Sequence, residues 1–240
     1  MRLRLVALGC TVAGALGFLA LPAAAAGAAG LPRPAMSITA AASSAYGARV
    51  IFTVTLEARV PAATVSVYAT PAGGKRTLLT TAKVSAAGNL YPHYKVTRST
   101  TFTAVFAGDA EDAAAAVSRT VLVPAQVTDG LTGYYKTTTI GGVTYRVYHG
   151  GDTLLLKATV RPGKHGECVE PETQQYDRGT GWDADTKYGC DHLDSQSHDA
   201  APFSLLQAVG DRYRIRADYL RGGDTANLSA NAPWLYFEVG

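Results

Sequence analysis

The sequence has few cysteines and no segment with a sustained helical period. Three of its 240 residues are cysteine, and no window places apolar residues at helical spacing between capping residues, which argues against α-helical and α/β folds. The glycine pairs at 73–74, 141–142, 150–151 and 222–223 each separate strand-like segments, so they indicate turns and not a phosphate-binding loop. No serine stands in a nucleophile elbow, which argues against the serine hydrolases that use one.

The chain also lacks a large net charge. The formal charge is +3 for all 240 residues, and it falls to +1 when the two arginines among residues 1–29 are removed. This small charge argues against a nucleic acid or an anionic membrane as the partner. Residues 30–125 hold nine Lys/Arg and four Asp/Glu, whereas residues 126–240 hold eleven and fifteen. The two halves therefore differ in sign although their sum is nearly neutral.

The first 29 residues have the composition of a secretory signal. Arg2 and Arg4 precede an apolar run over residues 5–21, and the stretch PAAAAGAAG follows, with cleavage sites near Ala26 or Ala28. The apolar run is shorter than the roughly 20 residues of a membrane span, so we expect no membrane span in the mature chain. The last residues, WLYFEVG, contain no cell-wall sorting motif. The protein is therefore expected to be secreted into the extracellular medium and released.

The cysteines predict one disulfide. Cys10 lies inside the expected signal and is discarded with it. Cys168 and Cys190 remain, and an exported chain reaches a compartment in which such a pair oxidises. In the loop-entropy model, this closure stabilises the fold by about 3 kcal/mol. A zinc site would need two more ligands, and the nearby His165 and His192 stand at no standard zinc spacing.

Alternating side chains predict strands in the first half of the mature chain. In RVIFTVTLEARV the apolar side chains of Val50, Phe52, Val54 and Leu56 share one face. Further strand-like segments follow at intervals of about ten residues, with Gly, Pro or Asn between most of them. These segments are ATVSVYAT, KRTLLTTAKV, NLYPHYKV, TFTAVFAG and VSRTVLVP.

The second half repeats this pattern. In DRYRIRADY the side chains of Tyr213, Ile215, Ala217 and Tyr219 share one face, and charged side chains share the other. The inward set matches Phe102, Ala104 and Phe106 of the first half, and a Gly-Asp pair follows each strand, at 108–109 and 223–224. We also expect a hairpin around Gly141–Gly142, followed by a strand with Leu154, Leu156, Ala158 and Val160 on one face.

The length of the mature chain suits two domains. About 210 residues exceed one small sandwich and allow two domains that each bury a core. The tract VPAQVTDG, residues 123–130, combines Pro124 with Asp129–Gly130 and separates two strand-rich regions. We therefore expect an all-β fold with two tandem β-sandwich domains, residues 36–124 and 130–240.

The first domain resembles the bacterial Ig-like repeats of secreted and cell-surface proteins. The resemblance rests on AYGARVIFTVTLEA, ATVSVYAT and FTAVFAGDAEDAAAAVS, and it spans roughly residues 36–124. For residues 130–240 it is fainter, although the penultimate strand and its GGD turn fit. The resemblance implies Ig-like sandwiches that serve as stalks, spacers or adhesive modules, and it supplies no catalytic residues.

The most unusual segment is acidic. Between residues 167 and 199 there are nine acidic side chains and two basic ones. Asp183 and Asp185 place two hard oxygen ligands two residues apart, as calcium loops do. However, Lys187 and Tyr188 occupy the positions at which an EF-hand loop has Asp or Asn and then Gly. The favoured interpretation is a solvated acidic loop closed by the disulfide, with no metal and no cofactor.

Several residues of this segment are candidates for contact with a partner. They are Trp182, Asp183, Asp185, His192 and Asp194. We expect Trp182 to cover the disulfide, and an exposed ligand platform is the alternative. The strand with Arg212, Arg214 and Arg216 should lie beside the one with Glu170 and Glu172, so that opposite charges pair across the sheet.

The sequence leaves three functions open. The first is a non-enzymatic binding or adhesion module that acts by surface contact, with an unknown protein or glycan surface as partner. The second is a structural spacer or cell-envelope component. The third is a metal-dependent hydrolase that uses the cluster from His192 to Asp199, although no glutamate stands between its histidines as in zinc peptidases. The expected form is a monomer.

Overall fold

The computed structural model describes residues 30–57, 60, 62–206 and 209–240. These residues form strands, turns and irregular segments, and the expected all-β class is confirmed. No described helix has the length and apolar character needed to cross a bilayer. The expected signal, residues 1–29, lies outside the described residues, and so does Cys10.

The first half of the chain forms a sandwich of short antiparallel strands. One layer consists of β1 (Met36–Thr39), β3 (Thr53–Leu56) and β6 (Asn89–Leu90), continued by β2 (Arg49–Ile51) with β7 (His93–Lys95). The other layer consists, in order, of β5 (Thr77–Lys83), β4 (Thr64–Pro71), β8 (Thr100–Phe106) and β9 (Ala115–Val121). The predicted alternation is confirmed, because Val50, Phe52, Val54 and Leu56 are all buried in the core between the layers.

The second half forms a larger sandwich. Its smaller sheet has the order β10 (Gln126–Thr132), β13 (Thr153–Arg161), β18 (His198–Ser204). The larger sheet has the order β11 (Lys136–Ile140), β12 (Val143–Tyr148), β21 (Leu235–Val239), β19 (Arg212–Leu220), β14 (Cys168–Asp177), β15 (Gly181–Trp182). Three two-residue strands complete it, namely β16 (Thr186–Lys187) and β17 (Asp191–His192) on β14, and β20 (Ala230–Asn231) on β19.

The predicted features of the second sandwich are confirmed. Tyr213, Ile215, Ala217 and Tyr219 are buried in its core, as are the alternating apolar residues of β13. The hairpin of β11 and β12 turns at Gly141 and Gly142, whose φ angles of 59° and 81° are those of the tight turns that suit a twisted hairpin.

The strand order in both sandwiches is that of an Ig-like fold. In each, the first, second and fifth strands of the Ig-like plan form one sheet (β1, β3 and β6; β10, β13 and β18). The third, sixth and seventh strands form the other sheet (β4, β8 and β9; β14, β19 and β21). The fold class of two tandem Ig-like sandwiches therefore follows from the hydrogen-bonded strand order itself.

A strand precedes residue 130, the expected start of the second sandwich. Strand β10 starts at Gln126, and Ala125 and Val127 already lie in the second core. Asp129 and Gly130 do not form the expected turn, because they pair with Ala158 and Lys157 of β13. The Asp129 carboxylate also accepts a hydrogen bond from the Ala217 N–H at 3.1 Å. Ala217 lies between the part of β19 that pairs with β21 and the part that pairs with β20, so this bond gives its N–H an acceptor where neither strand pairs with it. We propose a domain boundary at Pro124.

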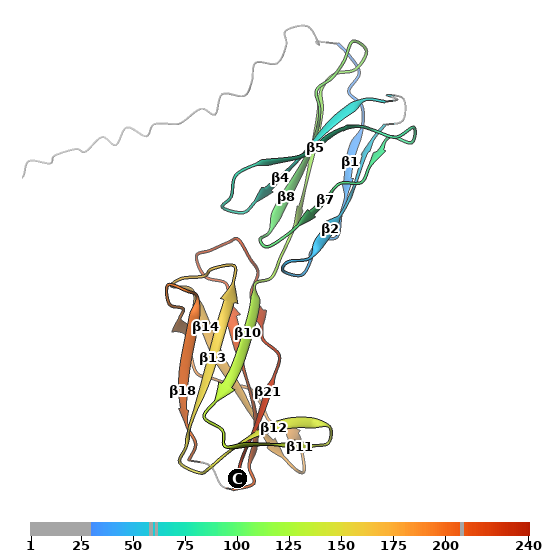
Figure 1. Ribbon diagram of the computed structural model, residues 1–240. Coiled ribbons are helices and arrows are strands. Elements are labelled where there is room, and N and C mark those ends of the chain that lie inside the picture. The colour runs from blue at the N-terminus through green and yellow to red at the C-terminus, as the bar shows by residue number, and fades with distance from the viewer. Residues whose placement is uncertain (1–29, 58–59, 61, 207–208) are drawn as a thin grey trace, which may run out of the picture.

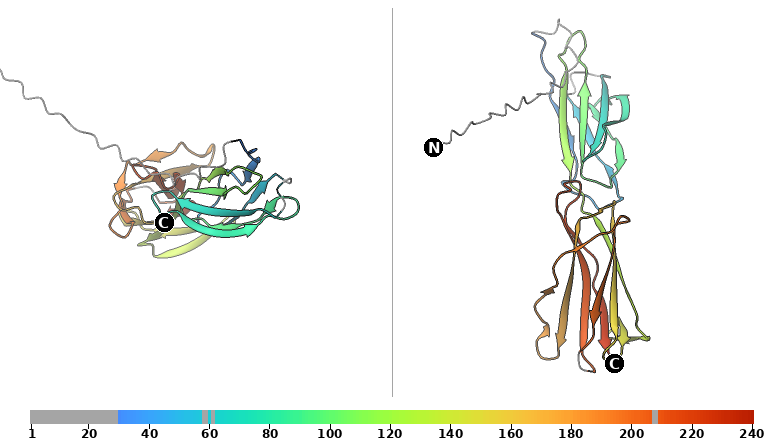
Figure 2. Two further views of the ribbon diagram at one scale, coloured as in Figure 1. Left: turned by 90° about the horizontal axis from the view of Figure 1, so that it is seen from above. Right: turned by 90° about the vertical axis from the view of Figure 1, so that its left-hand side faces the viewer.

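The two sandwiches lie end to end (Figure 1), and Figure 2 shows the same elongated shape from the side. The turn that follows β19, residues 221–229, reaches the first sandwich, and we call it the junction turn. The Asn227 amide donates to the carbonyl oxygens of Thr97 at 3.0 Å and Val123 at 3.2 Å. The Ser99 N–H donates to the Ala226 carbonyl at 2.7 Å. Asn227 is fully buried, so these bonds join the sandwiches through an interface without solvent at its centre.

Charged residues of the second sandwich hold the junction turn. The Glu167 carboxylate accepts from the N–H groups of Gly222 at 3.0 Å and Asp224 at 2.9 Å. The Lys164 ammonium is buried and pairs with the Asp224 carboxylate. Hydrogen bonds to a charged acceptor are stronger than neutral ones. Contacts within the second sandwich therefore hold this turn in addition to its bonds with the first sandwich.

The role of Asn227 predicts a stability effect. Asn227→Ala removes the donor from two carbonyl oxygens, and we expect a loss of roughly 1 to 3 kcal/mol. Both tryptophans, Trp182 and Trp234, lie in the second sandwich, so urea unfolding followed by tryptophan fluorescence should report this loss as a lower midpoint. The exposed Asn231 is the control, and Asn231→Ala should leave the midpoint unchanged. Equal midpoints for the two variants would contradict the assigned role.

Candidate contact groove

The acidic segment folds back along the free edge of β14. After β14 the chain turns, and β15, β16 and β17 pair in succession with the end, the middle and the start of that strand. We call residues 178–192 the return segment. Its pairing continues between the short strands, since the Asp183 N–H donates to the Gln175 carbonyl at 3.0 Å and the Tyr188 N–H to the Pro171 carbonyl at 3.1 Å. The expected irregular loop is therefore a broken edge strand.

The predicted disulfide closes this fold. It joins Cys168, the first residue of β14, to Cys190 in the return segment, with the Cα atoms 5.4 Å apart. At the other end of the segment, the Asp177 carboxylate accepts from the N–H groups of Gly179 at 2.7 Å and Thr180 at 2.9 Å. These bonds lower the pKa of Asp177, because the ionised carboxylate accepts them and so stabilises the turn.

Other acidic residues of the segment also have local structural partners. The Asp194 carboxylate accepts from the N–H groups of His198 at 2.9 Å and Gln196 at 2.8 Å, and these bonds lower the pKa of Asp194. The Asp185 carboxylate accepts from the Gln174 side chain, and the Asp183 carboxylate accepts from the Gln175 N–H at 2.7 Å. Much of the unusual local charge is thus used in turns and strand contacts.

Trp182 does not cover the disulfide, contrary to expectation. It pairs with Tyr176 in the β14–β15 ladder, whereas the disulfide is at Cys168. These two positions stand at opposite ends of β14, roughly 26 Å apart at about 3.3 Å per residue. The return of the chain along β14 keeps Trp182 beside Tyr176, whereas a free loop could have brought its ring to the disulfide.

The outer face of the larger sheet carries the predicted arginine row. Arg216 is paired with Glu172 in the β14–β19 register, and its Nη2 lies 3.1 Å from the carboxylate, so the expected cross-strand ion pair is confirmed. The Arg214 guanidinium carbon lies 4.6 Å from the ring centre of Trp182 and 4.5 Å from that of Trp234. Arg216 lies 4.3 Å from the same Trp234 ring. Arg214 therefore stacks on the Trp182 ring, which leaves less of this ring open to a ligand.

A buried carboxyl pair lies under this face. Glu172 and Asp218 are both buried, and Asp218 Oδ1 lies 3.0 Å from the Nε of Arg216. Burial and a hydrogen bond with Glu172 raise the pKa of Asp218 to about 7. Burial opposes the ionised form of Glu172 as well, but hydrogen bonds with Asp218 and Arg216 lower its pKa overall. The pair thus shares one proton, which Asp218 holds near neutral pH.

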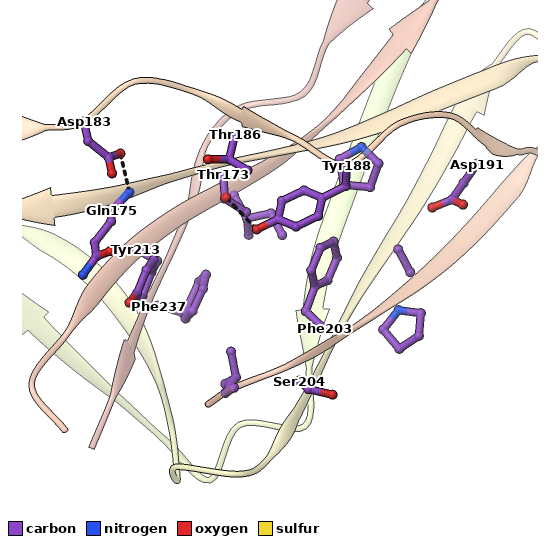
Figure 3. Close-up of a pocket in the computed structure, with 15 residues that line it drawn as sticks. Thr173, Gln175, Asp183, Thr186, Tyr188, Asp191, Phe203, Ser204, Tyr213 and Phe237 are labelled. Atoms are coloured by element: carbon purple, nitrogen blue, oxygen red, sulfur yellow. Dashed lines mark hydrogen bonds between the residues drawn. The ribbon is translucent and has the colours of Figure 1, made fainter. Parts of the chain in front are cut away.

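A groove of about 720 Å³ opens between the two sheets of the second sandwich (Figure 3). It lies between β14 with its return segment on one side and β18 on the other. In the described part of the chain, the return segment forms strand pairs with β14 and none with β18, so this edge of the sandwich stays open. The residues that line it are Pro171, Thr173, Gln175, Asp183, Thr186, Tyr188, Asp191, Ala201, Pro202, Phe203, Ser204, Leu205, Tyr213, Ile215 and Phe237.

Tyr188 spans the groove. Its hydroxyl oxygen is 3.1 Å from the hydroxyl of Thr173 on β14, and its ring meets Phe203 of β18 edge to face, with the ring centres 4.9 Å apart. Figure 3 shows this pair between Gln175 and Asp183 on one side and Asp191 on the other. Tyr188 is nevertheless 53% exposed. An aromatic side chain that is held at both ends and still exposed offers a contact surface with little entropy to lose.

The candidate contact residues divide between this groove and its surroundings. Asp183 lines the groove, whereas Asp185 and Trp182 lie on the outer face with Gln174 and Arg214. Sequence reasoning did not select Tyr188 or Phe203, because nothing in the strand pattern places them opposite one another. An unpaired aromatic residue inside a polar segment is the signal that could have marked Tyr188.

The histidine cluster lies outside the groove. His192 Nδ1 is 3.0 Å from the Gly166 carbonyl oxygen, and Asp194 is used in the turn between β17 and β18. His192, Asp194, His198 and Asp199 line a separate shallow hollow of about 540 Å³. Among the residues that the structure describes, no three His, Cys, Asp or Glu side chains are grouped as metal ligands. His192 and Asp194 of this cluster therefore bond to backbone groups in and beside the turn that connects β17 to β18.

Comparison with known proteins gives only distant likenesses. No family model matches the sequence, and no curated protein matches it. A solved tetra-tandem repeat from the extending region of a large adhesion protein is similar, with 14% identity and a TM-score of 0.38 over 84% of this chain and 49% of that one. The D0–D1 domain of intimin is similar at 14% identity, with a TM-score of 0.28 over 85% of this chain and 98% of that one.

A marsupial T cell receptor is similar at 13% identity, with a TM-score of 0.37 over 85% of this chain and 72% of that one. This chain thus spans about half the length of the adhesion-protein repeat. Two of the three structures carry names of adhesion proteins or their domains, and one is an immune receptor. Because all three TM-scores are below 0.5, these likenesses support no inference about function.

The carboxyl pair predicts a pH-dependent stability. Because the folded-state pKa of Asp218 lies above the value of about 3.9 in an unfolded chain, the stability from its bound proton is lost as the pH rises from about 4 to about 7. Asp129, whose pKa is raised by burial to about 6, acts in the same direction. We expect the melting temperature to fall between about pH 5 and about pH 7, and Asp218→Asn to reduce the fall by roughly half. An unchanged slope would refute the shared proton.

The disulfide predicts resistance to protease. Arg178 and Lys187 are trypsin sites within the return segment, and its pairing with β14 should protect them while the bridge is intact. Replacing Cys168 and Cys190 with alanine should lower the stability by about 3 kcal/mol and speed cleavage at both sites. Cleavage after Arg119, in β9 of the first sandwich, is the internal control and should not change. If the rates at all three sites rose together, the bridge would act on the whole chain and not on this segment.

Proposed function

We propose that this protein is a secreted, non-enzymatic binding protein that acts by surface contact through the groove between β14 and β18. The observation that carries the proposal is the exposed Tyr188 ring, held by Thr173 and Phe203 across an open groove of about 720 Å³. Pockets of this size with an apolar floor and a few polar groups at the rim are the usual form of a binding site.

The surroundings of the groove support a binding role. The return segment is held in place by the disulfide, by the turn at Asp177 and by its interrupted pairing with β14. None of its residues belongs to the buried core of the second sandwich. The sequence of this segment is therefore free to vary with its ligand, as loops on a rigid scaffold commonly do. Within the histidine cluster, the Asp194 carboxylate is engaged in a turn.

A structural spacer is the second candidate, and the junction favours it. The buried Asn227 and the ion-paired junction turn hold two sandwiches end to end, which gives a stiff elongated body. The two functions are compatible, because a stiff body can also present the groove to a partner. They differ in whether the groove itself takes part.

Site-specific photo-crosslinking tests the groove. A photoreactive phenylalanine analogue at position 188 should form an adduct with a partner from the native extracellular environment. The same analogue at Tyr91, an exposed tyrosine of the first sandwich, is the matched control and should form none. Equal yields from both positions, or adducts from Tyr91 alone, would remove the groove from the function and favour the spacer.

A further inference from the structure

We infer that the groove receives an apolar side chain of a partner polypeptide, that lysine or arginine flanks this side chain, and that the partner binds without pairing with the edge of β14 or of β18. This inference rests on the proposed function and deepens it by naming the class of ligand. Three independent features of the groove lead to it, namely its charge, its floor and the state of the two strand edges that border it.

The charge of the groove selects a cationic partner. Among the fifteen described residues that line it, Asp183 and Asp191 are charged, both are acidic, and no lysine, arginine or histidine is present. Figure 3 places these two carboxylates on opposite sides of Tyr188. An anionic ligand would meet two like charges with no compensating cation, which opposes binding, whereas lysine or arginine would find a partner at either side.

The floor of the groove accepts an apolar side chain. Leu205, Ile215 and Phe237 belong to the core and line the groove at its inner end, and the partly buried Phe203 lines it beside them. In Figure 3 the aromatic rings of the lining residues point into the space between β14 and β18. An apolar side chain placed here would exclude water from an already apolar surface, at about 25 cal/mol for each Å² covered. A ligand with an apolar centre and cationic flanks matches both floor and rim.

The edge of β18 is closed to strand addition. Leu205 exchanges hydrogen bonds with Asp152 and Gly151 beside β13, so by alternation the residues at even positions turn their backbone groups outward. At these positions Pro202 has no N–H, and the His198 N–H is hydrogen-bonded to the Asp194 carboxylate at 2.9 Å. A proline and an amide that is already bonded to a side chain protect an edge against pairing.

The edge of β14 is closed as well, because the return segment already occupies it. The Pro171 and Gln175 carbonyls accept from the N–H groups of Tyr188 and Asp183. The backbone of a ligand in the groove therefore finds neither β14 nor β18 open for pairing. The side chains of the ligand therefore have to supply the recognition, which distinguishes this groove from sites that bind by strand addition.

Titration of the isotope-labelled chain with three probes tests this inference. The probes are the capped pentapeptides Gly-Lys-Phe-Lys-Gly and Gly-Glu-Phe-Glu-Gly, and the neutral sugar cellohexaose. We expect the lysine peptide to shift the amide resonances of Tyr188, Phe203 and Ser204, with an affinity in the millimolar range that falls with added salt. The other two probes should bind at least about fivefold more weakly.

Two aspartates of the return segment form a matched pair of variants. Asp183→Asn removes a charge from the groove and keeps an oxygen that can accept from the Gln175 N–H, and it should weaken the lysine peptide by roughly threefold to fivefold. Asp185→Asn removes the same charge on the outer face beside Gln174, and it should change the affinity by less than about 1.5-fold. An equal loss in both variants would show non-specific attraction to the acidic segment and overturn the inference.

The remaining outcomes separate this inference from the proposed function. Tighter binding of cellohexaose or of the glutamate peptide would overturn the ligand class. So would a crosslink at position 188 without any shift from the lysine peptide, although the proposed function would then stand. If position 188 formed no specific adduct and no probe shifted the groove resonances, the proposed function would fail together with the inference.

Discussion

The antiparallel ladder between β14 and β19 is the interaction on which the second sandwich depends. It pairs residues 168–175 with residues 213–220 and so decides which side chains face the core and which face outward. The inward set includes Ile215, which also forms part of the groove floor. The outward set includes the pair of Arg216 with Glu172. Without this register neither the core nor the buried carboxyl pair could form.

The same ladder connects the groove to the junction. Strand β19 starts at the groove, which Tyr213 lines, and ends at the junction turn, where Asn227 meets the first sandwich. The Gly-Asp pair after the equivalent strand of the first sandwich also forms a turn, since the Asp109 carboxylate accepts from the N–H groups of Glu111 and Asp112 at 2.9 Å each. At the position of Asn227 the first sandwich has Asp112. A carboxylate cannot donate to carbonyl oxygens as Asn227 does, so the two turns are alike in shape but not in what they can join.

The side-chain period of two allowed the strands to be predicted. Alternation at Val50 to Leu56 and at Tyr213 to Tyr219 identifies buried faces, because a strand with one face in a core must alternate. The cross-strand pairing of Arg216 with Glu172 could also be predicted, since it follows from which strands are neighbours in an Ig-like sheet. These predictions needed only local pattern and topology.

The groove and its surroundings could not be predicted, because they depend on where a segment without a regular period folds. The return segment has three two-residue strands, too short to show alternation. Its path alone moves Trp182 away from the disulfide and brings Tyr188 over Phe203. A related reason applies to the start of β10, since Asp129 and Gly130 are typical of turns, whereas pairing with the distant β13 and the bond to Ala217 keep them in a strand.

Amide hydrogen exchange tests most directly whether the return segment is paired along β14. The N–H groups of Asp183 and Tyr188 are bonded to carbonyls of β14, and these bonds hold the segment as one wall of the groove. Both amides should exchange at least about a hundredfold more slowly than in an unstructured peptide, and reduction of the disulfide should diminish the protection. Exchange of both amides at unprotected rates in the oxidised protein would mean that the segment is a solvated loop and that the groove has no fixed wall.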